Sequence, residues 1–281
     1  MRRPPRVVMA TLSLVALVVL TSCAGDATKA HEPTSPLAAS TQAVTWDLVA
    51  LGDSNVAGWA VRSDEPYTPE EAFPGVYADL LGKVQGVTVV LHSYFPSQDD
   101  NEIRTVAEWN DVLATDRQMR ADLAAAEVVI VWIGYHNVIP VLMFGECGLS
   151  WPDPLKGCLR AATRTMPQDY DRLFGTIEQL VPSGTPMLVG DYGIPAPLFD
   201  QWSWEPFWPQ LKRAMFEEWR DALEAAAEAH GATVVHTYAA LNGPTGDEAP
   251  GRDLTSDGWH FNSEGHRFIA ETFLAEDGIS P

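Results

Sequence analysis

Five short apolar runs, rich in β-branched residues and separated by longer amphipathic segments, constrain this chain more than any other feature of its sequence. The runs lie at 46–52 (WDLVALG), 87–92 (VTVVLH), 128–134 (VVIVWIG), 186–191 (PMLVGD) and 233–238 (TVVHTY). Such runs are typical of strands covered on both faces, and the segments between them have helical periodicity. We expect helices near 70–83, 101–125, 168–181, 207–230 and 263–275. The pattern predicts an α/β domain, a three-layer αβα sandwich around a central parallel sheet of about five strands.

Two longer segments, 138–166 and 192–206, lack a clear period and are expected to be insertions. In open parallel sheets, ligands bind beyond the carboxyl ends of the strands, and long non-periodic segments there are commonly functional. We therefore expect both segments to cover that edge of a domain spanning 44–281. The residues that follow each strand are the first candidates for chemistry.

Charge and composition limit the partners of the chain. Among its 281 residues, 46% are hydrophobic and 20% are charged, which is typical of a folded globular protein. The chain has 18 basic and 38 acidic residues, which give it a formal charge of −20. Because nucleic acids and anionic lipid surfaces bind basic faces, neither is expected as an electrostatic partner. Neutral substrates fit this balance better, and the oligomeric state stays open.

The N-terminus has the features of an export signal over residues 1–22. Three arginines precede an apolar run that extends from Val7 to Leu20 and is too short for an ordinary membrane span. The sequence Leu20-Thr21-Ser22-Cys23 resembles the lipobox of bacterial lipoproteins, which implies that Cys23 is acylated and becomes the first mature residue. An ordinary secretory signal is the alternative, and both interpretations place the protein outside the cytoplasm.

The export interpretation has consequences for the rest of the chain. Residues 23–43 are rich in Ala, Thr, Ser and Pro without an apolar period, so we expect a disordered tether. The mature chain would be more acidic still, at −23, because the signal holds Arg2, Arg3 and Arg6 and no acid. Attachment to the outer face of the cell membrane would then depend on lipid rather than on charge.

Two further cysteines, Cys147 and Cys158, lie in a stretch rich in Gly, Pro and Trp. An oxidising compartment favours a disulfide that closes this short loop. Two free thiols, or half of a metal site, are the alternatives. No closely spaced Cys/His set accompanies the pair in the sequence, so zinc is not indicated.

The first run ends in Gly52-Asp53-Ser54-Asn55, a sequence that permits a sharp turn from strand to helix. Such a turn can present the Ser54 hydroxyl, together with its own N–H, at the edge of the sheet. Taken alone the pattern is weak, because Ser and Asp in this place are more often turn formers or helix caps. A nucleophilic role for Ser54 therefore needs a base elsewhere in the chain.

A candidate base lies 206 residues after Ser54, in the segment SDGWHFNSEGH that covers 256–266. Asp257 and His260 are three residues apart, a spacing that lets the carboxylate hold one imidazole nitrogen while the other faces a hydroxyl. The alternative is that Asp257 caps a turn and His260 is an ordinary loop histidine. Geometry allows a Ser-His-Asp triad.

Together these motifs resemble the SGNH (GDSL) hydrolases: GDS after the first strand, a Gly-containing turn after the third, and DGWHFNSEGH before the last helix. The likeness spans about residues 45–275. It implies a flavodoxin-like fold, serine esterase or lipase activity without metal or cofactor, and roles for three residues. Ser54 would be the nucleophile, His260 the base and Asp257 the residue that orients it.

The departures from the family pattern concern the oxyanion hole, to which Ser54 would contribute its backbone N–H. The family sequence Gly-x-Asn-Asp is Gly134-Tyr135-His136-Asn137 here, so either Asn137, which we slightly prefer, or His136 would donate. The second block lacks its glycine, and counting from His92 places Ser97 in that position. Asn55 stands where the family usually has Leu, a change expected to alter packing more than chemistry.

Substrate preference is harder to derive from the sequence. Trp204, Trp208 and Trp259 could form an aromatic wall for a sugar ring or an acyl chain, or could simply anchor the insertion. The remaining histidines considered, His92, His230, His236 and His266, are expected to be structural or exposed. The motifs at the strand ends contain no nameable acid/base pair for glycosidase chemistry.

The sequence therefore favours an extracytoplasmic, membrane-tethered esterase that acts on neutral O-acyl esters. Its substrate would be a small-molecule or glycan ester: carbohydrate O-acetyl groups, short-chain lipids or aryl esters. One alternative is an O-acyltransferase, in which a sugar hydroxyl replaces water. The other is a non-catalytic, glycan-binding envelope lipoprotein with an inactive oxyanion hole.

Overall fold

The central layer of the protein is a five-stranded parallel sheet. The computed structural model describes residues 44–59, 61, 68–95, 104–143 and 148–279, which belong to one compact unit, Gln42–Pro281. Its strands run in the order β2-β1-β3-β4-β5, the order of flavodoxin-like sheets. Their bounds are β1 Thr45–Gly52, β2 Thr88–Tyr94, β3 Val128–Trp132, β4 Met187–Gly190 and β5 Thr233–Val235. The predicted fold is confirmed, and each strand begins and ends within three residues of the predicted positions.

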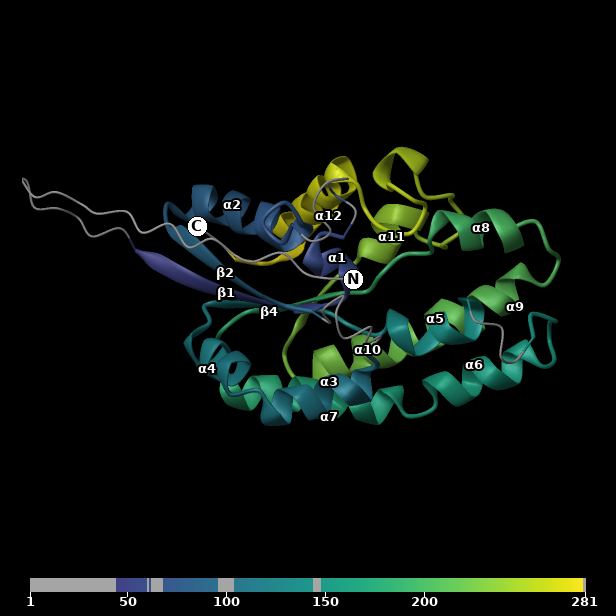
Figure 1. Cartoon of the computed structure of the whole chain (residues 1–281), viewed down its shortest axis with the longest axis horizontal. Helices are drawn as coiled ribbons and strands as arrows, with labels where there is room; N and C mark the ends of the chain where they lie inside the picture. The colour runs from purple at the N-terminus through teal and green to yellow at the C-terminus, as the bar shows by residue number, and fades with distance from the viewer. Residues whose placement is uncertain (1–43, 60, 62–67, 96–103, 144–147, 280–281) are drawn as a thin grey trace, which may run out of the picture. The chain divides into compact units, whose positions relative to one another are not determined.

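Helices cover both faces of the sheet (Figure 1). One face carries α1 (Ser54–Ala57), α2 (Phe73–Gln85), α11 (Thr237–Asn242) and α12 (Ser263–Glu276). The other carries α3 (Val106–Thr115), α4 (Arg117–Ala125), α7 (Met166–Leu180) and α10 (Glu218–Ala229). Helices α5 (Tyr135–Met143), α6 (Leu155–Thr163), α8 (Ala196–Trp202) and α9 (Trp208–Lys212) extend past the carboxyl ends of the strands. A short π-helix spans Arg213–Glu217, and a 3-10 turn spans Arg252–Leu254.

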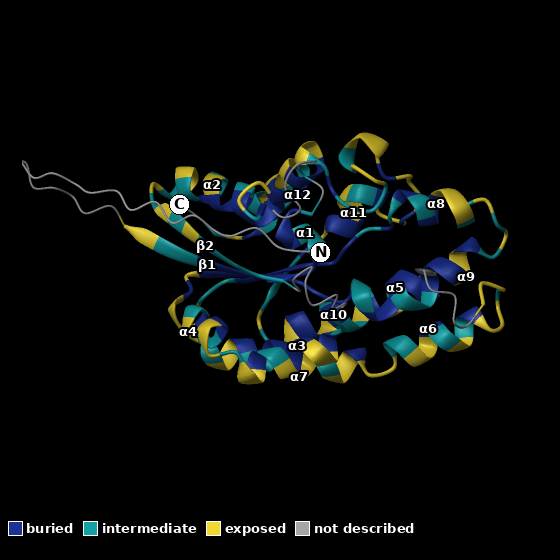
Figure 2. Cartoon of the chain, in the orientation of Figure 1, coloured by how far each residue is buried: buried dark blue, intermediate teal, exposed yellow. Residues whose placement is uncertain are grey.

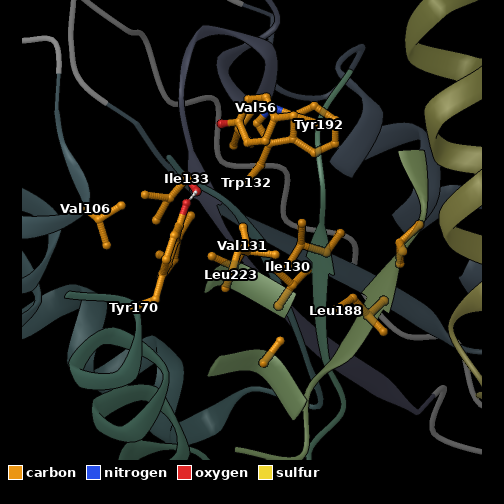
Figure 3. Close-up of a cluster of buried hydrophobic side chains, with 14 of the residues drawn as sticks. Val56, Val106, Ile130, Val131, Trp132, Ile133, Tyr170, Leu188, Tyr192 and Leu223 are labelled. Atoms are coloured by element: carbon orange, nitrogen blue, oxygen red, sulfur yellow. Dashed lines mark hydrogen bonds between the residues drawn. The ribbon is translucent and has the colours of Figure 1, made fainter. Parts of the chain in front are cut away.

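The core lies between the sheet and the two helical layers, where Figure 2 shows the buried residues. Every residue of β3 is buried, as expected for a central strand between two helical layers. At its end the Tyr170 hydroxyl donates to the Ile133 carbonyl over 2.9 Å (Figure 3). Gly134 follows at φ 143°, and a Cβ there would lie 1.9 Å from the Tyr170 hydroxyl. The turn after β3 therefore requires glycine.

Two predicted boundaries were wrong for local reasons. The single helix expected over 101–125 is divided at Asp116, whose extended backbone ends α3 and whose carboxylate accepts from the N–H groups of Gln118 and Met119 at the start of α4. The last strand ends at Val235 rather than at 238, because the chain turns into α11 at Thr237. In both cases the apolar pattern continues across the break.

The two segments without a sequence period contain helices. Helices α5 and α6 lie wholly or partly within 138–166, and α8 lies within 192–206. All three extend past the carboxyl ends of the strands, where the insertions were expected (Figure 1). Within the described residues, no helix is both long enough and apolar enough to cross a membrane.

His266, in α12, joins that helix to α2 on the same face of the sheet. Its ring is fully buried, and its Nδ1 accepts from the Phe73 N–H, at the start of α2, over 3.0 Å. The ring also lies against Phe73 and Phe261. Burial lowers the pKa of His266 to about 3, and the nearby charge of His260 contributes. The expectation that His266 is structural is confirmed.

This histidine should make the fold sensitive to acid. The unfolded chain binds a proton at His266 near pH 6.5, whereas the folded chain does so only near pH 3. Between these values stability is lost as the pH falls, by about 1.4 kcal/mol per pH unit once well below 6.5. We expect urea unfolding to show this slope, and His266→Asn, which keeps an acceptor for Phe73, to reduce it. An equal slope in wild type and variant would contradict this assignment, and exposed His236→Asn is the control.

Candidate active site

The turn that follows β1 places Ser54 at the carboxyl edge of the sheet. Asp53 caps α1 by accepting from the Asn55 N–H over 2.8 Å, and Ser54 is the first residue of that helix. Gly52 is needed before it, because a Cβ there would lie 2.3 Å from a Val56 methyl group and 2.8 Å from the Trp132 carbonyl oxygen. The sequence thus folds Ser54 into a tight turn from strand to helix, as its Gly-Asp-Ser pattern indicated.

Asp257 and His260 form a hydrogen-bonded pair. The Nδ1 atom of His260 lies 2.7 Å from Asp257 Oδ2, while Asp257 Oδ1 accepts from the N–H groups of Trp259 and His260 at 2.8 Å each. Burial raises the pKa of Asp257, but these bonds outweigh it and leave the pKa below its usual value. Asp257 is therefore a carboxylate at neutral pH. Its Oδ2 holds His260 at Nδ1, which leaves Nε2 on the far side of the ring.

A hydrogen bond that the sequence did not reveal joins the segments carrying Ser54 and His260. The Asn55 side-chain oxygen accepts from the Phe261 N–H over 3.3 Å, across 206 residues of sequence. Each partner is the residue immediately after its catalytic candidate. The Trp59 ring, from the same segment as Ser54, also lies near the His260 ring, with 6.1 Å between their centroids. The two motifs therefore meet in space.

Replacing Asn55 by Leu, the residue usual in the family, should weaken this junction. Leu is of similar size but cannot accept from Phe261, so the His260 loop loses one attachment to the Ser54 turn. We expect kcat on aryl acetate to fall about tenfold with little change in KM, since about 1.4 kcal/mol is within the range for a lost hydrogen bond. Asn55→Asp, which keeps an oxygen acceptor, should recover much of the rate. An unchanged kcat in Asn55→Leu would show that the bond does not position His260.

A second unpredicted contact holds Asp53. The Tyr192 hydroxyl, just past the end of β4, donates to Asp53 Oδ2 over 2.8 Å in a buried setting. Tyr192 has φ 60°, a left-handed conformation that is rare for a bulky residue and often marks functional sites. Its ring packs on Trp132, with 4.5 Å between the centroids (Figure 3). Tyr192 thus supports the residue that precedes Ser54.

The slight preference for Asn137 as oxyanion donor is not supported by its contacts. Its side-chain oxygen accepts from the Val106 N–H over 3.0 Å, and its amide reaches the Ala162 carbonyl at 3.5 Å. These partners belong to α3 and α6, so Asn137 joins two helices, and no described contact directs its side chain toward Ser54.

His136 lies closer to the site, within electrostatic range of Asp53 and His260. Burial lowers its pKa, so the ring is neutral at pH 7 and carries a single N–H. The ring donates to the Arg104 carbonyl. As placed, the neutral ring has no further N–H to offer an oxyanion.

Several predicted positions lie outside the described residues. Ser97, Cys23, Cys147 and the segments 1–22 and 23–43 are among them, so the Ser97 donor, the signal, the lipidation and the tether stay predictions. Cys158 lies in α6. Its disulfide with Cys147 also stays a prediction.

The three candidate tryptophans have different surroundings. Trp208 is 4% exposed and packs edge-on against Phe199, so it is a core residue and not part of an open wall. Trp204, just after α8, is 72% exposed. Of the three, only Trp259 lines the apolar cavity beside the candidate catalytic loop, where Trp132 from β3 also lies. The aromatic wall expected from the sequence is thus reduced to Trp259 at this cavity.

The other histidines considered make structural or peripheral contacts. His92 lies 3.1 Å from Asp47, and His230 bonds Glu178 and Asp171 across α7 and α10. His236 is exposed at the start of α11, where it approaches Asp191 and Glu224.

Asp191, Glu224 and His236 could in principle hold a metal ion, because their ligand atoms lie within 4.8 Å of one another. The Arg220 guanidinium already occupies this place, 3.0 Å from Glu224 and 3.8 Å from Asp191. The arrangement is that of an ion-pair network rather than a metal centre.

A five-stranded parallel sheet in the order β2-β1-β3-β4-β5, covered by helices on both faces, is the fold of the SGNH (GDSL) hydrolases. Residues 50–268 match the model of the GDSL-like Lipase/Acylhydrolase family. The chain therefore belongs to this family, and it is a carboxylic ester hydrolase. No curated protein sequence matches it.

Solved structures share the fold at low identity. The lipase Lip_vut3 from a goat rumen metagenome has a TM-score of 0.63 at 17% identity, covering 84% of this chain and 98% of its own. Axe2, an acetylxylan esterase from Geobacillus stearothermophilus, has a TM-score of 0.55 at 18% identity, covering 84% of this chain and 95% of its own. Phospholipase A1 from Streptomyces albidoflavus has a TM-score of 0.53 at 17% identity, covering 83% of this chain and 100% of its own. At these identities the likeness establishes the fold alone.

Proposed function

We propose that the protein is an exported, membrane-tethered serine esterase that hydrolyses neutral O-acyl esters with Ser54, His260 and Asp257. The observation that carries the proposal is the junction of the two motifs. Asp257 holds His260 over 2.7 Å, and the Asn55–Phe261 bond fastens that loop to the turn bearing Ser54. A carboxylate, an imidazole and a hydroxyl in this order form the arrangement of a serine hydrolase.

The chemistry follows from the roles of the three side chains. Ser54 Oγ attacks the ester carbonyl carbon while His260 Nε2 takes its proton, and Asp257 stabilises the imidazolium. The tetrahedral intermediate collapses, the C–O bond to the alcohol breaks, and His260 returns the proton to the leaving oxygen. Water then attacks the acyl-Ser54 ester by the same route, releasing the acid and regenerating Ser54.

The developing oxyanion requires N–H donors. In this proposal they are the backbone N–H groups of Ser54 and Ser97, since Asn137 is bonded to other partners and neutral His136 donates to Arg104. One such donor is typically worth about 10²–10³ in rate. A backbone N–H is kept when Ser replaces Gly at position 97.

The proposed location rests on the N-terminal sequence. The arginine-flanked apolar run and the Leu-Thr-Ser-Cys sequence support export and acylation of Cys23. Activity should therefore sediment with membranes of the expressing cells, and Cys23→Ala should release it. Activity that stays in the cytosol in both forms would contradict the export proposal.

The experiment that tests the chemistry follows both products of an aryl acetate with the purified full-length protein. Hydrolysis predicts that acetate is released in step with the phenol, with or without an added acceptor sugar. If the acceptor diverts most acyl groups into a sugar ester, the protein is an O-acyltransferase. Glycan binding without turnover of any ester would instead favour the non-catalytic alternative.

A further inference from the structure

A small apolar cavity lies beside the candidate catalytic residues. Its lining includes Asn55, Trp259 and Phe261, the neighbours of Ser54 and His260 in the sequence. Trp132, Tyr135 and Tyr192 line it from the ends of β3 and β4, and α8 and α11 contribute further apolar side chains. A cavity in this place, with this lining, suits an apolar group attached to the ester carbonyl.

The size of the cavity restricts what it can hold. Its volume is about 40 Å³, room for roughly three water molecules at about 10–15 Å³ each. An acetyl group fits within such a space, whereas a long acyl chain would extend beyond it. One added methylene changes the rate in a hydrophobic pocket by roughly 10–200-fold. Since walls that move aside would accept the larger group, the rigidity of the lining matters.

Tyr192 gives the lining this rigidity. Its hydroxyl is bonded to Asp53 over 2.8 Å, and its backbone is held at φ 60°. Its ring packs on Trp132, with centroids 4.5 Å apart, and on Tyr135 and Trp219, at 5.7 Å each. Figure 3 shows the Tyr192 and Trp132 rings together at the end of β3. Both ends of the side chain are thus fixed.

We infer that this cavity is the acyl site and that Tyr192 limits it to acetyl and similarly short groups. The inference rests on the proposed esterase and narrows its substrates to acetate esters and their closest analogues. Tyr192 would thus contact both the turn that carries the nucleophile and the site that holds the acyl group. Its hydroxyl supports the turn that bears Ser54, and its ring limits the space for the acyl group.

The test compares p-nitrophenyl acetate with p-nitrophenyl hexanoate, which share a leaving group. We expect wild type to favour acetate in kcat/KM by about 100-fold or more. Tyr192→Asn shortens the side chain and tolerates the left-handed backbone, so the ratio should shift toward hexanoate by about tenfold or more. Tyr192→Phe keeps the ring, so the ratio should stay within about threefold of wild type while kcat falls.

A second variant, at another residue of the cavity, keeps the test informative if Tyr192→Asn does not fold. Leu241 lines the same cavity but is only partly buried, so Leu241→Ala enlarges the site at a smaller cost to the core. It should shift the ratio in the same direction. Val84→Ala, at an exposed position on α2, is the matched control and should leave the ratio unchanged.

The outcomes separate this inference from the proposed function. If wild type hydrolyses both esters and neither enlarged variant changes their ratio, the acyl assignment is wrong and the esterase stands. The assignment also fails if these variants change the preference among acetate esters of different alcohols but not among acyl chains, because the cavity would then hold the alcohol. If wild type turns over no ester, both proposals fail.

Discussion

Replacement of Ser54 by Ala should reduce kcat on aryl acetates by about 10⁴–10⁶-fold, the largest effect of any single change in this protein. Without Oγ no acyl-enzyme forms, and the remaining groups can only assist attack by water. The fold should tolerate the change, because Asp53 rather than Ser54 caps α1. The thermal midpoint should stay within a few degrees of wild type.

The matched control for Ser54→Ala is Ser263→Ala at the start of α12. This serine belongs to the same C-terminal block as His260 but not to the proposed triad, and Asn262 is the cap of its helix. Its variant should retain activity close to wild type. If Ser54→Ala keeps more than about a tenth of the wild-type kcat while the protein is folded, Ser54 is not the nucleophile.

Asp257→Asn should lower kcat by about 10⁴-fold through the tautomer of His260. The Asn side-chain oxygen can still accept from the Trp259 and His260 N–H groups, so the loop should keep its shape. Its NH₂ group then faces His260 Nδ1, which must become an acceptor. The ring proton moves to Nε2, and His260 can no longer take the proton of Ser54.

Asp253→Asn is the control for this second variant. Asp253 is an exposed residue of the same loop, and its backbone carbonyl, not its carboxylate, accepts from Asn262. The same chemical change there should leave kcat within about threefold of wild type. Similar losses in both variants would indicate a general effect of charge on the loop rather than control of the His260 tautomer.

The sheet could be predicted because its central strands, β1, β3 and β4, are largely buried on both faces. Runs such as 128–134 contain almost no polar residues, and this is visible without any knowledge of partners. Helix boundaries were harder to predict from the sequence. The apolar pattern runs through Asp116, and only the two bonds from its carboxylate to the next helix show that one helix ends there and another begins.

The triad candidates were predictable because each lies in a local motif at a strand end. The contacts that position them were not, because they join distant segments. Asn55 was expected to alter packing, yet its oxygen accepts from Phe261 on the catalytic loop. The left-handed backbone of Tyr192 was not predicted, since that conformation is usual for glycine. The Asp-Tyr-Gly sequence directly after β4 was the one available signal.

The choice between His136 and Asn137 also depended on information absent from the sequence. Both residues follow the same glycine, and either side chain can donate a hydrogen bond. In the structure each has other partners: Asn137 bonds to α3 and α6, and His136 donates to the Arg104 carbonyl, so neither assignment gains support. Contacts of this kind appear only when the layers are assembled.

The central claim, that Ser54 is an activated nucleophile, is tested most directly by covalent labelling with a fluorophosphonate followed by peptide mass spectrometry. The account predicts one adduct, on the peptide that contains Ser54, which forms more slowly in Asp257→Asn and in the presence of excess aryl acetate. Labelling of a different residue, or ester turnover by a protein that takes up no label, would contradict it.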